Sequence, residues 1–130
     1  MRATREVVHQ LKRNRPVLFT NSLFSGRSFI AVPMGTRFHL PLATTPLGIA
    51  AKMKIPLHIV TTIEEEPFSR YITRVSPALT PHEAALVADT DARIADLALQ
   101  ARDILQGLIR AYPDQIRLWD QLIDLQDITR

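Results

Sequence analysis

Histidine is the side chain best suited to proton transfer near neutral pH, and the chain carries four: His9, His39, His58 and His82. None of them lies at helical ligand spacing from a second histidine or from a suitably placed carboxylate, so the zinc-protease pattern is absent. His58 falls within an apolar run, which favours a hydrogen-bonded core or edge histidine over a metal ligand. The sequence therefore predicts no metal site.

Serine and cysteine are the other candidate nucleophiles. The chain has no cysteine, which excludes a thiolate nucleophile, a disulfide and a cysteine-based zinc site. Ser22 and Ser28 have neither an adjacent base nor a surrounding Gly-x-Ser-x-Gly turn. The segment 25–28 has the composition of a phosphate-binding turn but lacks the glycine spacing of a phosphate loop. The sequence therefore predicts no self-sufficient catalytic set.

Charge divides the chain into two unlike halves. Residues 1–54 carry nine Lys and Arg against one acid, a net charge of +8, and residues 55–130 carry seven against twelve, a net charge of −5. A basic half suits anionic lipid headgroups, phosphorylated substrates or nucleic acid, and it equally suits attraction between the two halves. We expect no nucleic-acid partner, because no reader motif is present and Phe19 and Phe29 fall in predicted strands.

The elements that position these residues follow from apolar periodicity and turn residues. Helices are predicted at residues 4–12, 45–53, about 89–112 and about 116–125, with a helical turn that begins at Thr80-Pro81-His82-Glu83. Strands are predicted at residues 17–20, 29–32, 57–63 and 70–75. Thr45 is expected to cap its helix, residues 37–41 to form a loop with His39 beside a cation, and residues 64–66 to form a turn.

The order of these elements predicts an α/β fold with a mostly parallel or mixed sheet and two C-terminal helices. A chain of 130 residues fits one domain, which we assign to residues 1–130. No apolar run reaches the roughly 18 residues that cross a bilayer, and the N-terminus does not read as a signal peptide. We therefore expect a cytoplasmic protein that meets a membrane from its surface or through a partner.

Five segments, in order, carry a family resemblance: Asn14–Phe19, Ile30–Gly35, Ala43–Ala50, Lys54–Val60 and Leu108–Gln115, the last followed by Leu118 and Trp119. Together they resemble the C-terminal half of the lipid A biosynthesis (lauroyl/myristoyl) acyltransferases, within the lysophospholipid acyltransferase group. The resemblance runs from about residue 5 to about residue 125. It implies an incomplete acyltransferase-like α/β layer.

The resemblance also implies transfer of a fatty acyl group, usually from acyl carrier protein, onto a lipid hydroxyl, with no metal or other cofactor. In the family a histidine in a His-x4-Asp or His-x4-Glu pair is the general base, and the carboxylate orients its ring. No histidine of this chain has Asp or Glu five positions later, and Asn21-Ser22 stands where the family has Asp-Gln. The resemblance therefore assigns no catalytic residue here, and it implies an inner-membrane, cytoplasmic-face location without the family's own anchor.

Three readings stay open. The chain is a truncated or split acyltransferase that another chain completes, a non-catalytic module that binds lipid or acyl carrier protein, or a subunit that pairs with itself or with a companion chain. Residues expected to contact a phosphate or acyl-carrier group are Asn21, Ser22, Arg27, Arg37, Thr44 and Thr45. Ordinary loop solvation and helix capping account for the same residues equally well.

Overall fold

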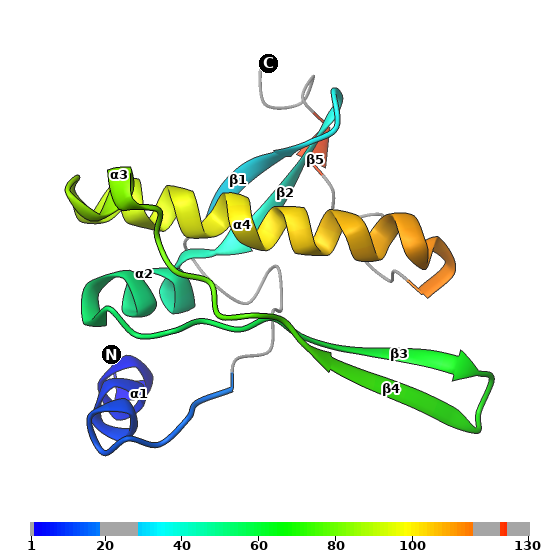
Figure 1. Ribbon diagram of the computed structural model, residues 1–130, viewed down its shortest axis with the longest axis horizontal. Helices are drawn as coiled ribbons and strands as arrows, with labels where there is room; N and C mark the ends of the chain where they lie inside the picture. The colour runs from blue at the N-terminus through cyan, green and yellow to red at the C-terminus, as the bar shows by residue number, and fades with distance from the viewer. Residues whose placement is uncertain (1, 19–28, 116–122, 125–130) are drawn as a thin grey trace.

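The structure is a computed structural model that describes residues 2–18, 29–115 and 123–124. Its helices are α1 (Arg2–Lys12), α2 (Thr44–Met53), α3 (Glu83–Leu86), α4 (Thr90–Ala111) and the short 3-10 helix η1 (Pro113–Gln115). Its strands are β1 (Phe29–Met34), β2 (Phe38–Ala43), β3 (Val60–Glu66), β4 (Arg70–Val75) and β5 (Ile123–Asp124). Figure 1 shows α4 crossing the molecule, with α2 and the β1–β2 hairpin against it and the β3–β4 hairpin reaching outward.

Helix α4 is the central element of the fold, and the sequence predicted it. Asp89 is its N-cap, and the side chain accepts a hydrogen bond from the backbone N–H of Ala92 at 2.9 Å. The helix ends at Ala111, two residues before Pro113, because proline cannot continue the i to i−4 hydrogen bonding. Its apolar residues recur every three to four positions, which places them along one side of the helix.

The first hairpin pairs β1 with β2 in antiparallel register, from Phe29 opposite Ala43 to Met34 opposite Phe38. Its turn contains Gly35 with a φ of +69°, a conformation that glycine adopts without steric cost. The predicted strand at 29–32 is confirmed. The predicted loop at 37–41 is wrong, because these residues are the turn end and most of β2.

Pro41 explains why β2 was missed. Proline interrupts a ladder because it has no backbone N–H, so a run that contains it reads as a loop. In the structure β5 pairs only with Phe38 and His39, and among the described residues the rest of that side of β2 has no strand beside it. A proline is tolerated where a strand lies at an edge.

The second hairpin pairs β3 with β4, from Val60 opposite Val75 to Glu66 opposite Arg70, with an irregularity between Glu64 and Glu66. The predicted strand at 70–75 is confirmed. The strand predicted at 57–63 is shifted: it begins at Val60, while Leu57 forms an isolated bridge with Leu79. The acidic residues 64–66 lie inside β3, and the turn follows at 67–69.

The described strands form small antiparallel sheets, and the mostly parallel or mixed sheet expected from the sequence is not found among them. Each hairpin is closed by a three-residue turn, whereas a parallel pair needs a crossover of a dozen or more residues. The coarser prediction, a mixed α/β composition, is confirmed.

Two other predicted elements fall partly outside the described residues. Of the predicted strand at 17–20, Val17 and Leu18 are described and lie in irregular backbone, and the rest is outside the described part. The predicted terminal helix at about 116–125 is also largely outside it. Where it is described, at Ile123 and Asp124, the chain pairs with β2 as β5 instead.

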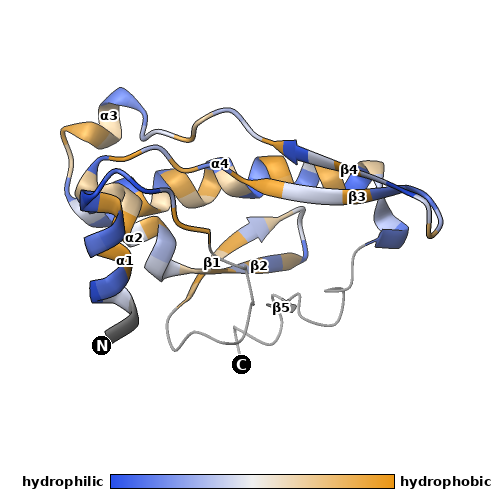
Figure 2. Ribbon diagram, turned by 90° about the horizontal axis from the view of Figure 1, so that it is seen from below, coloured by the Kyte–Doolittle hydropathy of each residue, from blue (hydrophilic) through white to orange (hydrophobic). Residues whose placement is uncertain are grey.

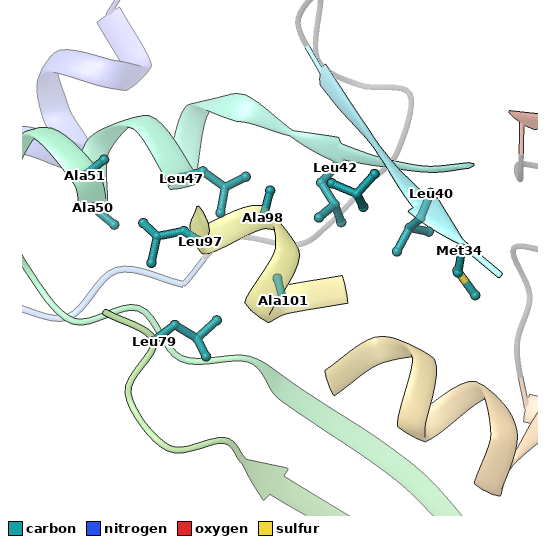
Figure 3. Packing of buried hydrophobic residues seen from close by; sticks show 11 residues of the cluster. Met34, Leu40, Leu42, Leu47, Ala50, Ala51, Leu79, Leu97, Ala98 and Ala101 are labelled. Carbon is teal, nitrogen blue, oxygen red and sulfur yellow. The ribbon is translucent and has the colours of Figure 1, made fainter. Parts of the chain in front are cut away.

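One apolar core connects α2, α4 and the first hairpin. Its buried members are Val32, Met34, Leu40, Leu42, Leu47, Ala50, Ala51, Leu79, Leu97, Ala98 and Ala101. Figure 3 shows Leu97 and Ala98 of α4 beside Leu47 of α2, and Figure 2 shows hydrophobic residues along α4 and the elements next to it. The small side chains of Ala50, Ala98 and Ala101 allow the helix backbones and the hairpin to approach closely.

Helix α1 lies beside α2, at the edge of the molecule, in both Figure 1 and Figure 2. Val7, Val8 and Leu11 are half-buried, and none of them belongs to the buried core. Among the helices that the structure describes, none is long and apolar enough to cross a bilayer.

Candidate functional site

The structure describes half of the residues predicted to contact substrate. Asn21, Ser22 and Arg27 lie outside the described residues. Arg37 is exposed in the turn between β1 and β2, and its guanidinium carbon lies 5.4 Å from the centroid of the Phe38 ring. A guanidinium at that distance from an aromatic face is attracted by the ring.

Thr44 and Thr45 lie at the opposite end of β2, where they are the first two residues of α2. The residue at the N-cap is Ala43, so the prediction that Thr45 caps this helix is wrong by two positions. Six strand residues separate Arg37 from Thr44, a span of about 20 Å. The structure therefore does not bring Arg37 together with the two threonines.

Basic residues gather instead on α1 and the turn that follows it. Arg5, His9, Lys12, Arg13 and Arg15 are exposed, and we call this set the basic α1 surface. The helical members recur at spacings of three and four, so they share one side of the helix.

The other side of α1 is apolar. Val7, Val8 and Leu11 lie there, half-buried, with Leu11 one turn along the helix from the two valines. A helix with a basic side and an apolar side is typical of segments that lie on a membrane surface or bind an acidic partner. The charge is also well placed for the helix itself, because His9 and Lys12 occupy the last turn, next to the negative end of the helix dipole.

The single acid of α1 lies on the flank of this surface. Glu6 accepts a hydrogen bond from Nε2 of Gln10 at 2.5 Å, and Oε1 of Gln10 accepts one from Nη1 of Arg15 at 3.2 Å. Within the described residues no carboxylate forms an ion pair with Arg5 or Arg13. The positive charge of the basic α1 surface is therefore directed to solvent.

A second cluster joins α3 to α4, and sequence reasoning missed it. His82 precedes α3, and its ring Nδ1 lies 2.8 Å from Oδ1 of Asp96 on α4. The backbone N–H of His82 donates to Oδ2 of the same carboxylate at 2.7 Å. Nε2 of Gln100 donates to Oδ2 of Asp96 at 3.0 Å and to the carbonyl oxygen of Thr80 at 2.8 Å. His82 and Asp96 are fourteen positions apart in the sequence, so a search at helical spacing could not find the pair.

These hydrogen bonds change the acidity of Asp96. Partial burial raises the pKa of its carboxyl group, but the hydrogen bonds from the backbone and ring of His82 and from Gln100 outweigh this effect. The net result is a pKa below the ordinary value of 3.8. Asp96 is therefore a carboxylate at neutral pH, and it accepts every one of these hydrogen bonds.

The pair has the arrangement of a base and its orienting group. With Nδ1 of His82 donating to Asp96, a neutral ring has its lone pair on Nε2, and 72% of the His82 side chain is exposed. A histidine held in this way can accept a proton from a hydroxyl group. The same contacts also have a purely structural effect, because they tie the first residues of α3 to the middle of α4.

His58 and His39 have surroundings that differ from those of His82. His58 is exposed, and its Nδ1 lies 2.8 Å from the carbonyl oxygen of Ser76, so it is hydrogen-bonded as predicted. His39 lies in β2 and not in a loop, and its Nδ1 is buried without a hydrogen-bond partner among the described residues. A buried ring nitrogen is not positioned to face a phosphate in solvent.

No group of three or more metal-ligating side chains gathers in the described part of the chain. Comparison with protein-family models, with curated proteins and with solved structures finds no match for this chain. Residue chemistry and geometry are therefore the grounds on which a function can be proposed.

Proposed function

We propose that this chain is a catalytically incomplete, acyltransferase-like protein of the lipid A type that binds anionic lipid headgroups at the inner membrane's cytoplasmic face. The basic α1 surface carries this proposal. It combines four exposed Lys and Arg residues, on α1 and the turn that follows it, with the apolar side of that short helix. The other source of support is the order of five sequence segments that resemble the C-terminal half of that family.

The exposed cations set the expected strength of membrane binding. Each Lys or Arg close to an anionic membrane surface contributes about 1 kcal/mol to binding. Four such residues, together with the part of Val7, Val8 and Leu11 that the fold leaves exposed, support reversible association with a membrane. Because the Debye length is about 8 Å at physiological ionic strength, added salt is expected to weaken this binding.

The incompleteness rests on the histidines. Each of the four lacks Asp or Glu five positions later, so the family's base and its orienting carboxylate are not present in their usual arrangement. In this proposal the chain binds the lipid, and a second chain supplies the catalytic base. Acyl carrier protein or another acyl donor is then the partner of the assembled enzyme.

Vesicle co-sedimentation tests the proposal. We expect binding to vesicles that contain phosphatidylglycerol and little binding to pure phosphatidylcholine. Arg13→Glu is expected to weaken binding about tenfold or more, because it replaces a cation of the basic α1 surface by an anion. Arg110→Glu is the matched control, since Arg110 is also exposed near the C-terminal end of a helix. Equal binding to both vesicles, or equal weakening by both substitutions, would contradict the proposal.

The His82–Asp96 hydrogen bond favours a second function, in which the chain has its own base. In that case His82 accepts the proton of a lipid hydroxyl as the hydroxyl oxygen bonds to the acyl carbon. The thioester bond to the carrier protein then breaks, His82 returns the proton to the departing thiolate, and Asp96 orients the ring throughout. The purified chain would be incubated with acyl-loaded carrier protein and a lipid A precursor. Turnover that His82→Ala abolishes and Asp96→Asn reduces would establish that the chain has its own base, and it would refute the proposal of a catalytically incomplete chain. Absence of turnover would refute the assignment of His82 as a base.

A further inference from the structure

The β3–β4 hairpin has only two strands, and its hydrogen-bonding pattern determines what each outer edge offers. The backbone N–H of Ser76 donates to the carbonyl oxygen of Ile59 at 2.9 Å, so these opposed residues form a hydrogen-bonded pair. Such pairs alternate along an antiparallel ladder. In the register of this hairpin, the pairs Ile63–Ile72 and Thr61–Arg74 are hydrogen-bonded, whereas Glu64–Tyr71, Thr62–Thr73 and Val60–Val75 are not.

An independent contact confirms this pattern. Gln115 donates from Nε2 to the carbonyl oxygen of Glu64 at 2.8 Å, and its Oε1 accepts from the backbone N–H of Glu64 at 2.9 Å. Both backbone groups of Glu64 therefore point away from β4, as expected for a residue in a non-hydrogen-bonded pair. The amide of Gln115 occupies this position on the outer edge of β3 as a neighbouring strand would.

The outer edge of β4 has no such cover among the described residues. Because Tyr71, Thr73 and Val75 belong to non-hydrogen-bonded pairs, their backbone N–H and C=O groups point away from β3. No other strand that the structure describes pairs with this edge. Figure 1 shows β4 on the outer side of the hairpin, away from α4. An open edge of this length is a site for strand addition.

The side chains beside this edge are also exposed. Tyr71, Thr73 and Val75 lie on one face of the hairpin together with Val60 and Thr62, and Tyr71 and Val75 are 58% and 62% exposed. The opposite face carries Ile63, which is buried, and Ile72, which is half-buried. The hairpin therefore packs one face inward and presents a β-branched and aromatic face outward.

We propose that β4 pairs with β4 of a second copy of this chain, antiparallel, about a two-fold axis at Thr73. The product is a four-stranded sheet in the order β3, β4, β4 and β3. In this register Thr73 lies opposite the partner's Thr73, and Tyr71 lies opposite the partner's Val75. Threonine pairs and pairs of aromatic with β-branched residues are favourable neighbours across strands.

Charge selects this register over its neighbours. With Thr73 opposite the partner's Thr73, Arg74 faces the partner's Ile72 and Arg70 faces the partner's Ser76. A shift that brings Ile72 opposite the partner's Ile72 places Arg70 opposite the partner's Arg74. A shift the other way places Arg74 opposite the partner's Arg74. Like charges directly opposite each other destabilise a pair of strands, so β4 is complementary to itself in the proposed register and not in the other two.

Two proline substitutions test the edge. Thr73→Pro removes an N–H that points to the proposed partner and leaves the hydrogen bonds between β3 and β4 intact. Thr62→Pro is the matched control: its N–H points to the other edge, and both substitutions remove the same hydroxyl hydrogen bond between Thr62 and Thr73, which is 3.1 Å long. Sedimentation equilibrium of the full chain is expected to show a concentration-dependent dimer that Thr73→Pro weakens about tenfold or more and Thr62→Pro does not.

Cysteine cross-linking tests the register between the two β4 strands without introducing a proline into either. The chain has no native cysteine, so Ile72→Cys, Thr73→Cys and Arg74→Cys each introduce a single thiol. A hydrogen-bonded pair has its Cα atoms about 5.5 Å apart, which a disulfide can span. Thr73→Cys is expected to form a disulfide-linked dimer fastest of the three under mild oxidation.

Sedimentation and cross-linking together decide whether two chains pair through β4. A concentration-dependent dimer that Thr73→Pro weakens selectively, with fastest cross-linking at residue 73, supports the proposal. A chain that is monomeric at every concentration overturns it, as does a dimer that tolerates Thr73→Pro. If circular dichroism shows that a proline variant is unfolded, cross-linking decides alone, and faster reaction at residue 72 or 74 overturns the proposed register.

Discussion

The carboxylate of Asp96 accepts hydrogen bonds from the backbone N–H of His82 at 2.7 Å and from the ring of the same residue at 2.8 Å. One side chain of α4 therefore holds the start of α3 by two separate groups. The backbone N–H at the start of a helix has no partner within that helix, so the first bond is a helix cap supplied from another element.

The two bonds predict unequal effects of substitution. Asp96→Ala removes both and is expected to lower the free energy of unfolding by about 1–2 kcal/mol. His82→Ala keeps the backbone cap and is expected to cost about half as much or less. Urea unfolding followed by circular dichroism measures both values. Equal losses in the two variants would show that the ring, and not the cap, stabilises this junction.

The same junction predicts a pH dependence. A carboxylate whose pKa is lowered in the folded state contributes stability that is fully present above the unfolded value of 3.8 and is lost as the pH falls through the folded value. The difference in unfolding free energy between the wild type and Asp96→Asn is therefore expected to shrink as the pH falls below about 4. Urea titrations across this range measure it, and a difference that grows on acidification would contradict the assignment.

We expect a large loss of stability when a side chain at the centre of the core is shortened. Leu97 is 1% exposed, and Leu97→Ala is expected to lower the unfolding free energy by about 3 kcal/mol, through lost burial and the cavity left behind. Leu99 is on the same helix and 40% exposed, so Leu99→Ala serves as the control, with an expected loss below about 1 kcal/mol. Similar losses for the two leucines would show that α4 does not pack through the face that carries Leu97.

Gln115 predicts local protection of β3. Gln115→Ala is expected to accelerate hydrogen exchange at the amide of Glu64, because that N–H loses its acceptor. Asp114→Ala, a change at the neighbouring exposed residue, is expected to leave this rate unaltered. Hydrogen exchange followed by nuclear magnetic resonance gives the rate for the single amide. Unchanged protection in Gln115→Ala would mean that another group covers the edge of β3.

A substitution at Lys54 is expected to stabilise the protein. It ends α2 with a φ of +55°, a left-handed conformation that is unfavourable for a residue with a side chain and free of that cost for glycine. Lys54→Gly is expected to raise the unfolding free energy by about 0.5–1 kcal/mol. Lys52→Gly, inside the same helix, is expected to lower it by about 1 kcal/mol. Thermal unfolding of the two variants compares them directly.

Local patterns in the sequence determined much of the secondary structure. The periodicity between Ile94 and Ile109 specified α4, and the alternation from Arg70 to Val75 specified β4, because helix and strand have different side-chain repeats. The distribution of charge also followed from the sequence, since composition alone separates a basic first half from an acidic second half.

Only the tertiary structure decided how these elements meet. The described strands pair antiparallel, whereas the sequence favoured a mostly parallel or mixed sheet, because apolar runs look alike in both kinds of sheet and the short turns at 35–37 and 67–69 set the direction. Arg37 and Thr44 are close in sequence but lie at opposite ends of β2, whereas His82 and Asp96 are distant in sequence but in contact. The sequence contains each residue's chemistry, but folding brings together groups whose separation along the chain has no regular spacing.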